Sequence, residues 1–419
     1  MRAVTDTITA SAEKLALPVP AMSEVVQSLH AKLRLPNIPA LDAMRAIAVF
    51  LVIFYHFGFA RVPAGLGVLV FFVLSGFLIT WLLVKENDRT EDISIRGFYL
   101  RRALRIFPAF YCFWFGTVLL LALTGRRIDW PHALSAFFYT SNYYQGIVKP
   151  PDSFVSHTWS LAIEEQFYLL WPGIFYLFRK DLRKLSFLVG GIIVFTWVWR
   201  WLLQFAWHVH QGYIYRAFET RADHLMVGCL LALTLRQRIL DTLCQRLCRF
   251  SWAPFVPAAL LAISACKYGQ SPDYRDSIGF VVEPLLVAVL LVQLMYFSST
   301  PLWKWVNAKV LRWLGRISYS LYLYQQVTLH PAHRLLARYP VIIQLAAGLT
   351  FTILMASASF YLVEKYFLQL KQRFSIYQLQ GKAGLQSEEA GVAGQEQRLI
   401  LSPNPERPQN ETRHATPAQ

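Results

Sequence analysis

The chain has 419 residues, of which 55% are hydrophobic and only 16% are charged, and its formal net charge is +16. The apolar residues come in blocks of about 20, the length at which a helix crosses a bilayer, so the composition excludes a soluble globular domain and predicts an all-α, polytopic transmembrane helical bundle. Lys and Arg lie in short clusters between these blocks, as the positive-inside rule expects, and this argues against nucleic acid as a partner.

The two ends of the chain are polar. Residues 1–40 contain several prolines and a short amphipathic run from Val25 to Leu33, and they predict a cytoplasmic N-terminal tail that lies partly on the membrane surface. Residues 41–368 hold the apolar blocks and form the predicted transmembrane domain. Residues 369–419 are rich in Gln, Glu, Gly and Pro, so we expect a disordered cytoplasmic C-terminal tail.

About ten apolar segments are candidate membrane spans, and the sixth and seventh are short or weakly bounded. Every second connection between them is richer in Lys and Arg, which predicts that both termini lie in the cytoplasm. We expect a multi-pass protein of the plasma (inner) membrane of a bacterium. The predicted spans are residues 42–60, 65–84, 103–124, 157–178, 186–207, 222–236, 252–267, 278–298, 313–331 and 340–363.

The first span carries two polar side chains, Arg45 and His56. Eleven helical steps return to within about 20° of the same face and cover roughly 16 Å along the axis. A charge at the centre of a membrane helix costs about 3 kcal/mol, so polar residues there are functional candidates by default. In the predicted topology Arg45 lies toward the cytoplasm and His56 in the outer half.

The second span contains small residues in an otherwise bulky helix, at Gly65, Gly67, Ser75 and Gly76. Small residues let membrane helices approach closely, so the favoured interpretation is helix packing. A lining role for Ser75 is the alternative.

The third span begins with an arginine cluster, in which Arg102 and Arg105 share a helix face. One interpretation is that these residues anchor the helix at the cytoplasmic membrane surface. Guanidinium groups also donate paired hydrogen bonds to phosphates. The other interpretation is therefore that the arginines bind a cytosolic cosubstrate that bears phosphate groups.

The fourth span places Glu164 and Glu165 near its outer end, after His157 and Trp159 at the helix entrance. Carboxylates are rare in membrane helices, which favours a function over a structural ion pair. The alternative for one of the two, with Glu165 favoured, is a position at the membrane interface. Ser160, Glu164 and Tyr168 follow at steps of four and share a face.

Two later motifs add polar residues to the predicted lining. In RADHLMVG, Arg221 and Asp223 either line a cavity or form a mutual ion pair. In GRISYSLYLYQQ the residues Ser318, Tyr319 and Gln325 indicate a hydrated cavity or hydrogen bonds between helices.

In this order the motifs resemble the acyltransferase family 3 membrane proteins, which O-acylate sugars and other cell-envelope or secreted molecules. The resemblance covers about residues 41–365. Some members continue into a periplasmic hydrolase-like domain, and this chain is similar to the stand-alone form. The matching features are the spacing of Arg45 and His56, FFVLSGF at 71–77, FYLRRALRIFP at 98–108, HTWSLAIEEQFY at 157–168, RADHLMVG at 221–228 and GRISYSLYLYQQ at 315–326.

The resemblance implies roles for five residues. Arg45 and His56 are implied to be essential, Arg102 and Arg105 to engage an acyl-coenzyme A donor, and Glu164 to belong to the catalytic region. The family commonly has His where this chain has Gln325, and this departure argues against a catalytic role at that position.

The expected reaction transfers an acyl group, most simply acetyl from acetyl-CoA, to a hydroxyl of an envelope or exported carbohydrate, either free or lipid-linked. His56 acts either as the base or as a transiently acylated nucleophile, because histidine titrates near pH 7. No metal is expected, since the five cysteines show no paired spacing. The alternative function is a proton-coupled transporter with His56, Glu164 and Asp223 as a relay.

Overall fold

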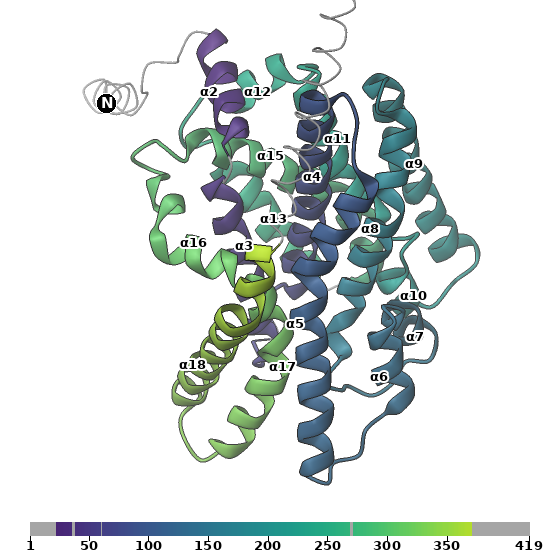
Figure 1. Ribbon diagram of the computed structural model, residues 1–419, viewed down its shortest axis with the longest axis vertical. Coiled ribbons are helices and arrows are strands. Elements are labelled where there is room, and N and C mark those ends of the chain that lie inside the picture. Colours follow the sequence, from purple (N-terminus) through teal and green to yellow (C-terminus); the bar gives the residue numbers. More distant parts are fainter. Residues whose placement is uncertain (1–21, 36–37, 60, 269–270, 371–419) are drawn as a thin grey trace, which may run out of the picture.

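The computed structural model describes residues 22–370 except 36–37, 60 and 269–270, so most of both predicted tails lies outside the described residues. All regular structure within these residues is helical, which confirms the all-α class. The long helices run roughly along one axis, with α2 and α12 near one end of the bundle and α6, α7 and α10 toward the other (Figure 1).

Six helical segments are long and apolar enough to cross a membrane, and they match six of the predicted spans. Four further helices coincide with the remaining predicted spans but are shorter or more polar. The first group consists of α3 (Pro39–His56), α4 (Ala64–Thr90), α5 (Ile95–Leu123), α9 (Leu182–Trp201, continued by η2, Leu202–Ala206), α15 (Phe280–Phe297, preceded by η3, Arg275–Gly279) and α18 (Val341–Ser359, continued by η5, Phe360–Glu364). The second group consists of α8 (Trp159–Phe178), α11 (Ala222–Arg236), α13 (Phe255–Tyr268) and α17 (Ser318–Leu335).

The predicted span 313–331 is in fact divided between two helices, α16 (Lys309–Arg316) and α17. Lys309, Arg312 and Arg316 recur at steps of three and four, so α16 has a charged stripe that suits an interface rather than a lipid core. The other short elements are α2 (Met22–Arg34), α6 (Trp130–Phe137), α7 (Ser141–Ile147), η1 (Ser156–Thr158), α10 (Gln211–Arg216), α12 (Asp241–Leu247), α14 (Pro272–Tyr274) and η4 (Lys304–Asn307).

Helix α2 lies within the stretch predicted as the N-terminal tail, and it packs onto the bundle. Val25, Leu29 and Leu33 recur at steps of four, and all three are buried. The indole nitrogen of Trp81 on α4 donates to the carbonyl oxygen of Leu33 at 3.1 Å. The amphipathic run therefore buries its apolar face against protein.

Helices α4 and α11 approach backbone to backbone at two glycines. A methyl group on Gly76 would lie 1.9 Å from the carbonyl oxygen of Leu225, and one on Gly228 would lie 2.1 Å from that of Val73. Such contacts are too short for any side chain, so only glycine permits this packing. The close-packing interpretation of the second span is confirmed at Gly76.

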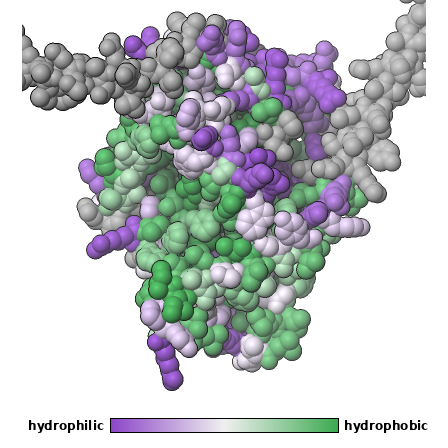
Figure 2. Space-filling view, turned by 90° about the vertical axis from the view of Figure 1, so that its left-hand side faces the viewer, coloured by the Kyte–Doolittle hydropathy of each residue, from purple (hydrophilic) through white to green (hydrophobic). Residues whose placement is uncertain are grey.

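Polar side chains gather at the end of the molecule where α2 and α12 lie, and hydrophobic side chains cover much of the rest of the face in Figure 2. At the polar end the last turns of α4 are tied to two neighbouring helices, because Glu86 binds Arg101 at 2.6 Å and Asp88 binds Arg236 at 2.6 Å. The exposed apolar side chains Leu177 and Phe187, which are 77% and 81% exposed, suit contact with lipid.

Candidate active site

His56 occupies the last turn of α3, and two acceptors face its Nδ1 atom. The carbonyl oxygen of Val52 lies 3.0 Å from Nδ1, and Oε1 of Gln325 on α17 lies 3.3 Å from it. Gln325 donates its amide nitrogen to the carbonyl oxygen of Tyr322 at 3.2 Å, which turns its oxygen toward His56. Because a carbonyl oxygen only accepts, Nδ1 carries the proton and Nε2 carries the lone pair.

A cavity of about 2500 Å³ lies beside His56, at the end of the bundle where α6, α7 and α10 lie (Figure 1). Its wall includes Trp159 and His157 at the start of α8, and Tyr322 and Gln326 on α17. Small-molecule pockets are usually about 300–1,000 Å³, so this cavity has room for several sugar units. His56 is thus placed where a large polar molecule can reach it.

His157 is a second histidine in this cavity, and sequence reasoning gave it no role. Its Nδ1 atom lies 3.1 Å from Oε1 of Gln326, so consecutive glutamines of α17 hold His56 and His157. The side chain is 2% exposed, and within the described residues its Nε2 atom has no hydrogen-bond partner. The available sequence signal was a histidine two residues before the Trp-Ser-Leu stretch that begins α8.

A second cluster lies around Glu164 and is separate from the cavity wall. Ser75 on α4 donates its hydroxyl to Oε1 of Glu164 at 2.8 Å. Arg102 lies over the ring of Tyr168 at 4.7 Å and interacts electrostatically with both Glu164 and Glu165. Helices α4, α5 and α8 therefore bring four of the predicted site residues together, and Glu165 faces the same arginine.

Two more arginines join this cluster from α3 and α5. Arg45 interacts electrostatically with Arg102, Arg105 and Tyr168, and its ion pair with Asp42 is long at 3.8 Å. Three guanidinium groups so close together repel one another unless anions lie between them. The cluster contains carboxylates of the protein and, in addition, a surplus of guanidinium groups. Guanidinium groups donate paired hydrogen bonds to phosphates, so the cluster suits a phosphate-bearing ligand.

Arg221 and Asp223 do not line the cavity, and they do not pair with each other. Asp223 is fully buried and binds Arg200 at 2.9 Å and Nδ1 of His224 at 2.7 Å. The guanidinium of Arg221 lies over the ring of Phe280 at 3.8 Å. The alternative of a mutual ion pair between Arg221 and Asp223 is therefore wrong, because Asp223 pairs with Arg200 on α9.

The remaining predicted residues make hydrogen bonds between helices. Ser160 lies 2.6 Å from the hydroxyl of Tyr322, which also donates to the carbonyl oxygen of His157 at 2.9 Å. Tyr319 donates its hydroxyl to the carbonyl oxygen of Ile106 at 3.2 Å. Ser318 is buried at the first position of α17. These contacts join α17 to α5 and α8 around the two histidines.

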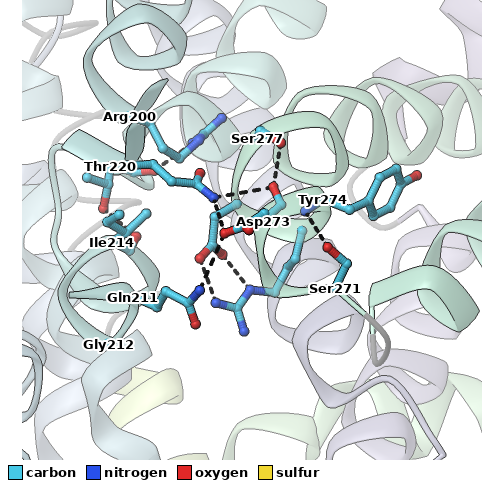
Figure 3. A network of polar contacts seen from close by, with 12 residues as sticks. Arg200, Gln211, Gly212, Ile214, Thr220, Ser271, Asp273, Tyr274 and Ser277 are labelled. Atoms are coloured by element: carbon cyan, nitrogen blue, oxygen red, sulfur yellow. Dashed lines mark hydrogen bonds and ion pairs between the residues drawn. The ribbon is translucent and has the colours of Figure 1, made fainter. Parts of the chain in front are cut away.

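One wall of the cavity is held by polar contacts among η2, α10, α14 and η3 (Figure 3). Gln204 and Gln211 both donate to Oδ1 of Asp273, at 2.9 Å and 3.5 Å. Arg275 donates two hydrogen bonds to Asp276. The network fixes the positions of Gln211 and Arg275, which both line the cavity.

Comparison with known families now supports the sequence resemblance. The family model described as an acyltransferase domain, Acyl_transf_3, matches residues 38–362. The chain belongs to acyltransferase family 3. The two histidines and the arginine cluster therefore lie within the family domain, and the predicted membership is confirmed.

The chain is similar to three curated relatives of bacterial origin. It is 31% identical over 308 residues to the peptidoglycan O-acetyltransferase OatA of Listeria monocytogenes, covering 68% of this chain and 48% of OatA. It is 30% identical over 351 residues to YrhL of Bacillus subtilis, covering 78% and 54%, and 30% identical over 331 residues to a provisionally named O-acetyltransferase of Staphylococcus aureus, covering 71% and 51%. The chain thus spans about half the length of these relatives. No solved structure matches it.

The described residues contain no group of three or more His, Cys, Asp or Glu side chains arranged to hold a metal ion. Histidine, glutamine, tyrosine and arginine side chains line the cavity, and arginine and carboxylate side chains form the second cluster.

Proposed function

We propose that the protein is an integral membrane O-acyltransferase that moves an acyl group, most simply acetyl, from cytosolic acyl-CoA to a hydroxyl of an envelope or exported glycan. The observation that carries the proposal is the position of His56 in the wall of a large cavity, with two carbonyl oxygens facing its Nδ1 atom. This arrangement favours the tautomer with the lone pair on Nε2. A lone pair on a neutral imidazole is the group that a hydroxyl needs in order to lose its proton near pH 7.

The arginine cluster supplies the donor site in this proposal. Arg102 and Arg105 bind the phosphates of coenzyme A, and Arg45 adds a third guanidinium from α3. Arg45 and His56 are eleven residues apart on one helix, or roughly 16 Å along its axis. The flexible pantetheine arm of coenzyme A suits that separation, because it carries the thioester far from the phosphates. Both chain termini and the arginine cluster are then on the cytoplasmic side.

In the direct mechanism, Nε2 of His56 takes the proton of the acceptor hydroxyl while the hydroxyl oxygen attacks the thioester carbonyl. The carbon–sulfur bond breaks, and the departing thiolate takes the proton from the imidazolium. Glu164 assists from the donor side through its contacts with Ser75 and the arginines. In the covalent alternative, Nε2 attacks the thioester first and the thiolate leaves. The acceptor hydroxyl then attacks the acyl-imidazole, the bond from the acyl carbon to Nε2 breaks, and the hydroxyl proton goes to the thiolate.

The cavity supplies the acceptor site. The relative OatA is named a peptidoglycan O-acetyltransferase, so the glycan strands of peptidoglycan are the first acceptor to test. Other envelope or secreted carbohydrates, including lipid-linked forms, belong to the same class. In this proposal the protein lies in the bacterial plasma membrane, and membrane lipids surround its helical bundle.

The transporter alternative needs a proton relay through His56, Glu164 and Asp223. Asp223 is already engaged with Arg200 and His224, and it does not line the cavity that His56 lines. An Arg102→Ala variant with normal glycan acylation and altered solute uptake would favour the transporter.

The test uses purified protein in lipid nanodiscs, radiolabelled acetyl-CoA and soluble glycan strands. His56→Asn keeps a donor near the position of Nδ1 but removes Nε2, so we expect at least a hundredfold loss of acetyl transfer. His208→Asn, an exposed histidine outside the cavity, is the control and keeps full activity. Normal transfer by His56→Asn overturns the proposal. A labelled protein adduct that forms without acceptor and depends on His56 selects the covalent mechanism.

A further inference from the structure

The cavity wall has an unusual surplus of arginine. Among the described residues that line it, six are arginines and only two are acidic, Asp129 and Asp152. A cavity of one charge sign concentrates ligands of the opposite sign, because its low-dielectric walls focus the field. The six arginines are Arg61, Arg126, Arg127, Arg216, Arg275 and Arg334.

Membrane topology does not explain this surplus. In the proposed orientation the cavity faces the outer side, where the positive-inside rule favours few cations. The arginines come from five separate parts of the chain: the α3–α4 connection, the α5–α6 connection, α10, η3 and the end of α17. Their convergence on one cavity is a property of the fold and not of a single basic loop.

Two of the arginines, Arg216 and Arg275, pack against an aromatic ring. The ring of Tyr215 lies next to both, with the guanidinium of Arg275 4.8 Å from its centre and that of Arg216 5.7 Å away. Arg275 also donates two hydrogen bonds to Asp276, which offsets its charge, so the other five arginines carry the surplus of positive charge. A guanidinium group that is held in place, such as that of Arg216 beside Tyr215, loses little side-chain entropy when it binds an anion.

We infer that the acceptor glycan is anionic, and that its carboxylate or phosphate groups bind the arginines of this cavity while one of its hydroxyls reaches His56. The inference rests on the proposed function and narrows its substrate class. Arginine forks match the two oxygens of a carboxylate or phosphate. The volume of about 2500 Å³ accommodates several sugar units together with such groups. Anionic lipid headgroups share this chemistry, but a cavity that contains the candidate base suits the reacting molecule better.

The experiment compares two acceptors that differ only in charge, in nanodiscs of zwitterionic lipid with acetyl-CoA as donor. One is a tetrasaccharide of alternating N-acetylglucosamine and N-acetylmuramic acid with free carboxylates, and the other is its carboxyl-amidated form. We expect the KM of the charged acceptor to be at least tenfold lower at low salt. The difference shrinks as sodium chloride is added, because salt screens exposed charges.

Variants assign this preference to the cavity. Arg126→Gln combined with Arg127→Gln raises the KM of the charged acceptor about tenfold and leaves that of the amidated acceptor unchanged. Arg338→Gln changes neither KM, because Arg338 is exposed near the end of α17 but does not line the cavity. Thermal unfolding of both variants at the wild-type temperature confirms that they are folded.

The outcomes are distinguishable. Equal KM values for the two acceptors, with no effect of the double variant, overturn the inference and leave the proposed function standing. A wild-type protein that acetylates neither acceptor nor intact glycan strands contradicts the proposed function itself. An effect of the double variant that appears only when the nanodiscs contain anionic lipid, and is equal for both acceptors, assigns the arginines to lipid headgroups and also overturns the inference.

Discussion

His56 and Gln325 meet across two helices that are 269 residues apart in the chain, with Nδ1 of the histidine 3.3 Å from the amide oxygen of the glutamine. Gln325→Leu removes this contact but leaves the carbonyl oxygen of Val52, so the tautomer survives with looser orientation. A neutral hydrogen bond contributes about 0.5–1.5 kcal/mol, so we expect kcat to fall roughly tenfold with little change in the KM of the donor.

The matched control for this prediction is Gln344→Leu. Gln344 is also a buried glutamine, but it lies on α18 and bonds the carbonyl oxygen of Tyr339. Steady-state kinetics of both variants give the comparison. A kcat that falls equally in the two would mean that Gln325 acts only on stability.

His157 is expected to contact the acceptor. Its Nε2 atom is buried at the cavity wall without a partner among the described residues, and a buried polar atom left unsatisfied is costly until a ligand bonds it. His157→Ala should lower kcat/KM for the acceptor by roughly 10- to 100-fold, equivalent to about 1–3 kcal/mol, with the KM of acetyl-CoA unchanged. A rise in the KM of acetyl-CoA alone would place His157 on the donor side instead.

Arg102 is expected to bind the donor through its forked geometry. Arg102→Lys keeps the charge but loses the paired donors and the stacking on Tyr168, so the KM of acetyl-CoA should rise about tenfold or more while acceptor KM stays constant. Arg96→Lys on the same helix is the control, because Arg96 is exposed. Isothermal titration with desulfo-coenzyme A measures the binding step directly. Equal affinities of the two variants would refute the assignment.

Gly76 carries a prediction about stability. Gly76→Ala places a methyl group 1.9 Å from the carbonyl oxygen of Leu225, so α4 and α11 must separate. Overpacking of this kind costs about 1–3 kcal/mol, and the unfolding temperature in detergent should fall by several degrees. Gly190→Ala in α9 has open space around the new methyl group and should leave the unfolding temperature unchanged. Equal unfolding temperatures of the two variants would contradict the packing argument.

The membrane spans could be predicted because an apolar run of about 20 residues has few other uses. The shared face of Arg45 and His56 also follows from the helical repeat alone. The contact between Ser75 and Glu164 does not, since it depends on the register between helices whose residues are 89 positions apart. Sequence periodicity describes one helix at a time and carries no information about that register.

The partner of Asp223 shows a different limit. Sequence proximity suggested Arg221, but Arg221 precedes the first residue of α11, and the carboxylate reaches Arg200 on α9 instead. The sequence could not name Arg200, because this pair depends on how α9 and α11 pack together. The sequence placed His157 at the helix entrance but gave it no role, because it precedes α8 in the short 3-10 helix η1, where α-helical spacing does not apply.

His132 on α6, outside the membrane spans, gives a prediction about pH. Burial lowers the pKa of His132 below its ordinary value of 6.5, and its Nδ1 atom lies 3.0 Å from the hydroxyl of Ser153. The unfolded chain therefore takes up a proton near pH 6.5 that the folded protein takes up only at lower pH, so stability falls as pH drops below about 6.5. His132→Asn keeps a polar group at this position but does not titrate, so its unfolding temperature should fall less between pH 7.5 and pH 5. His208→Asn, which alters an exposed histidine, should keep the wild-type pH dependence. The same pH dependence in the His132 variant as in the wild type would show that His132 does not titrate with folding.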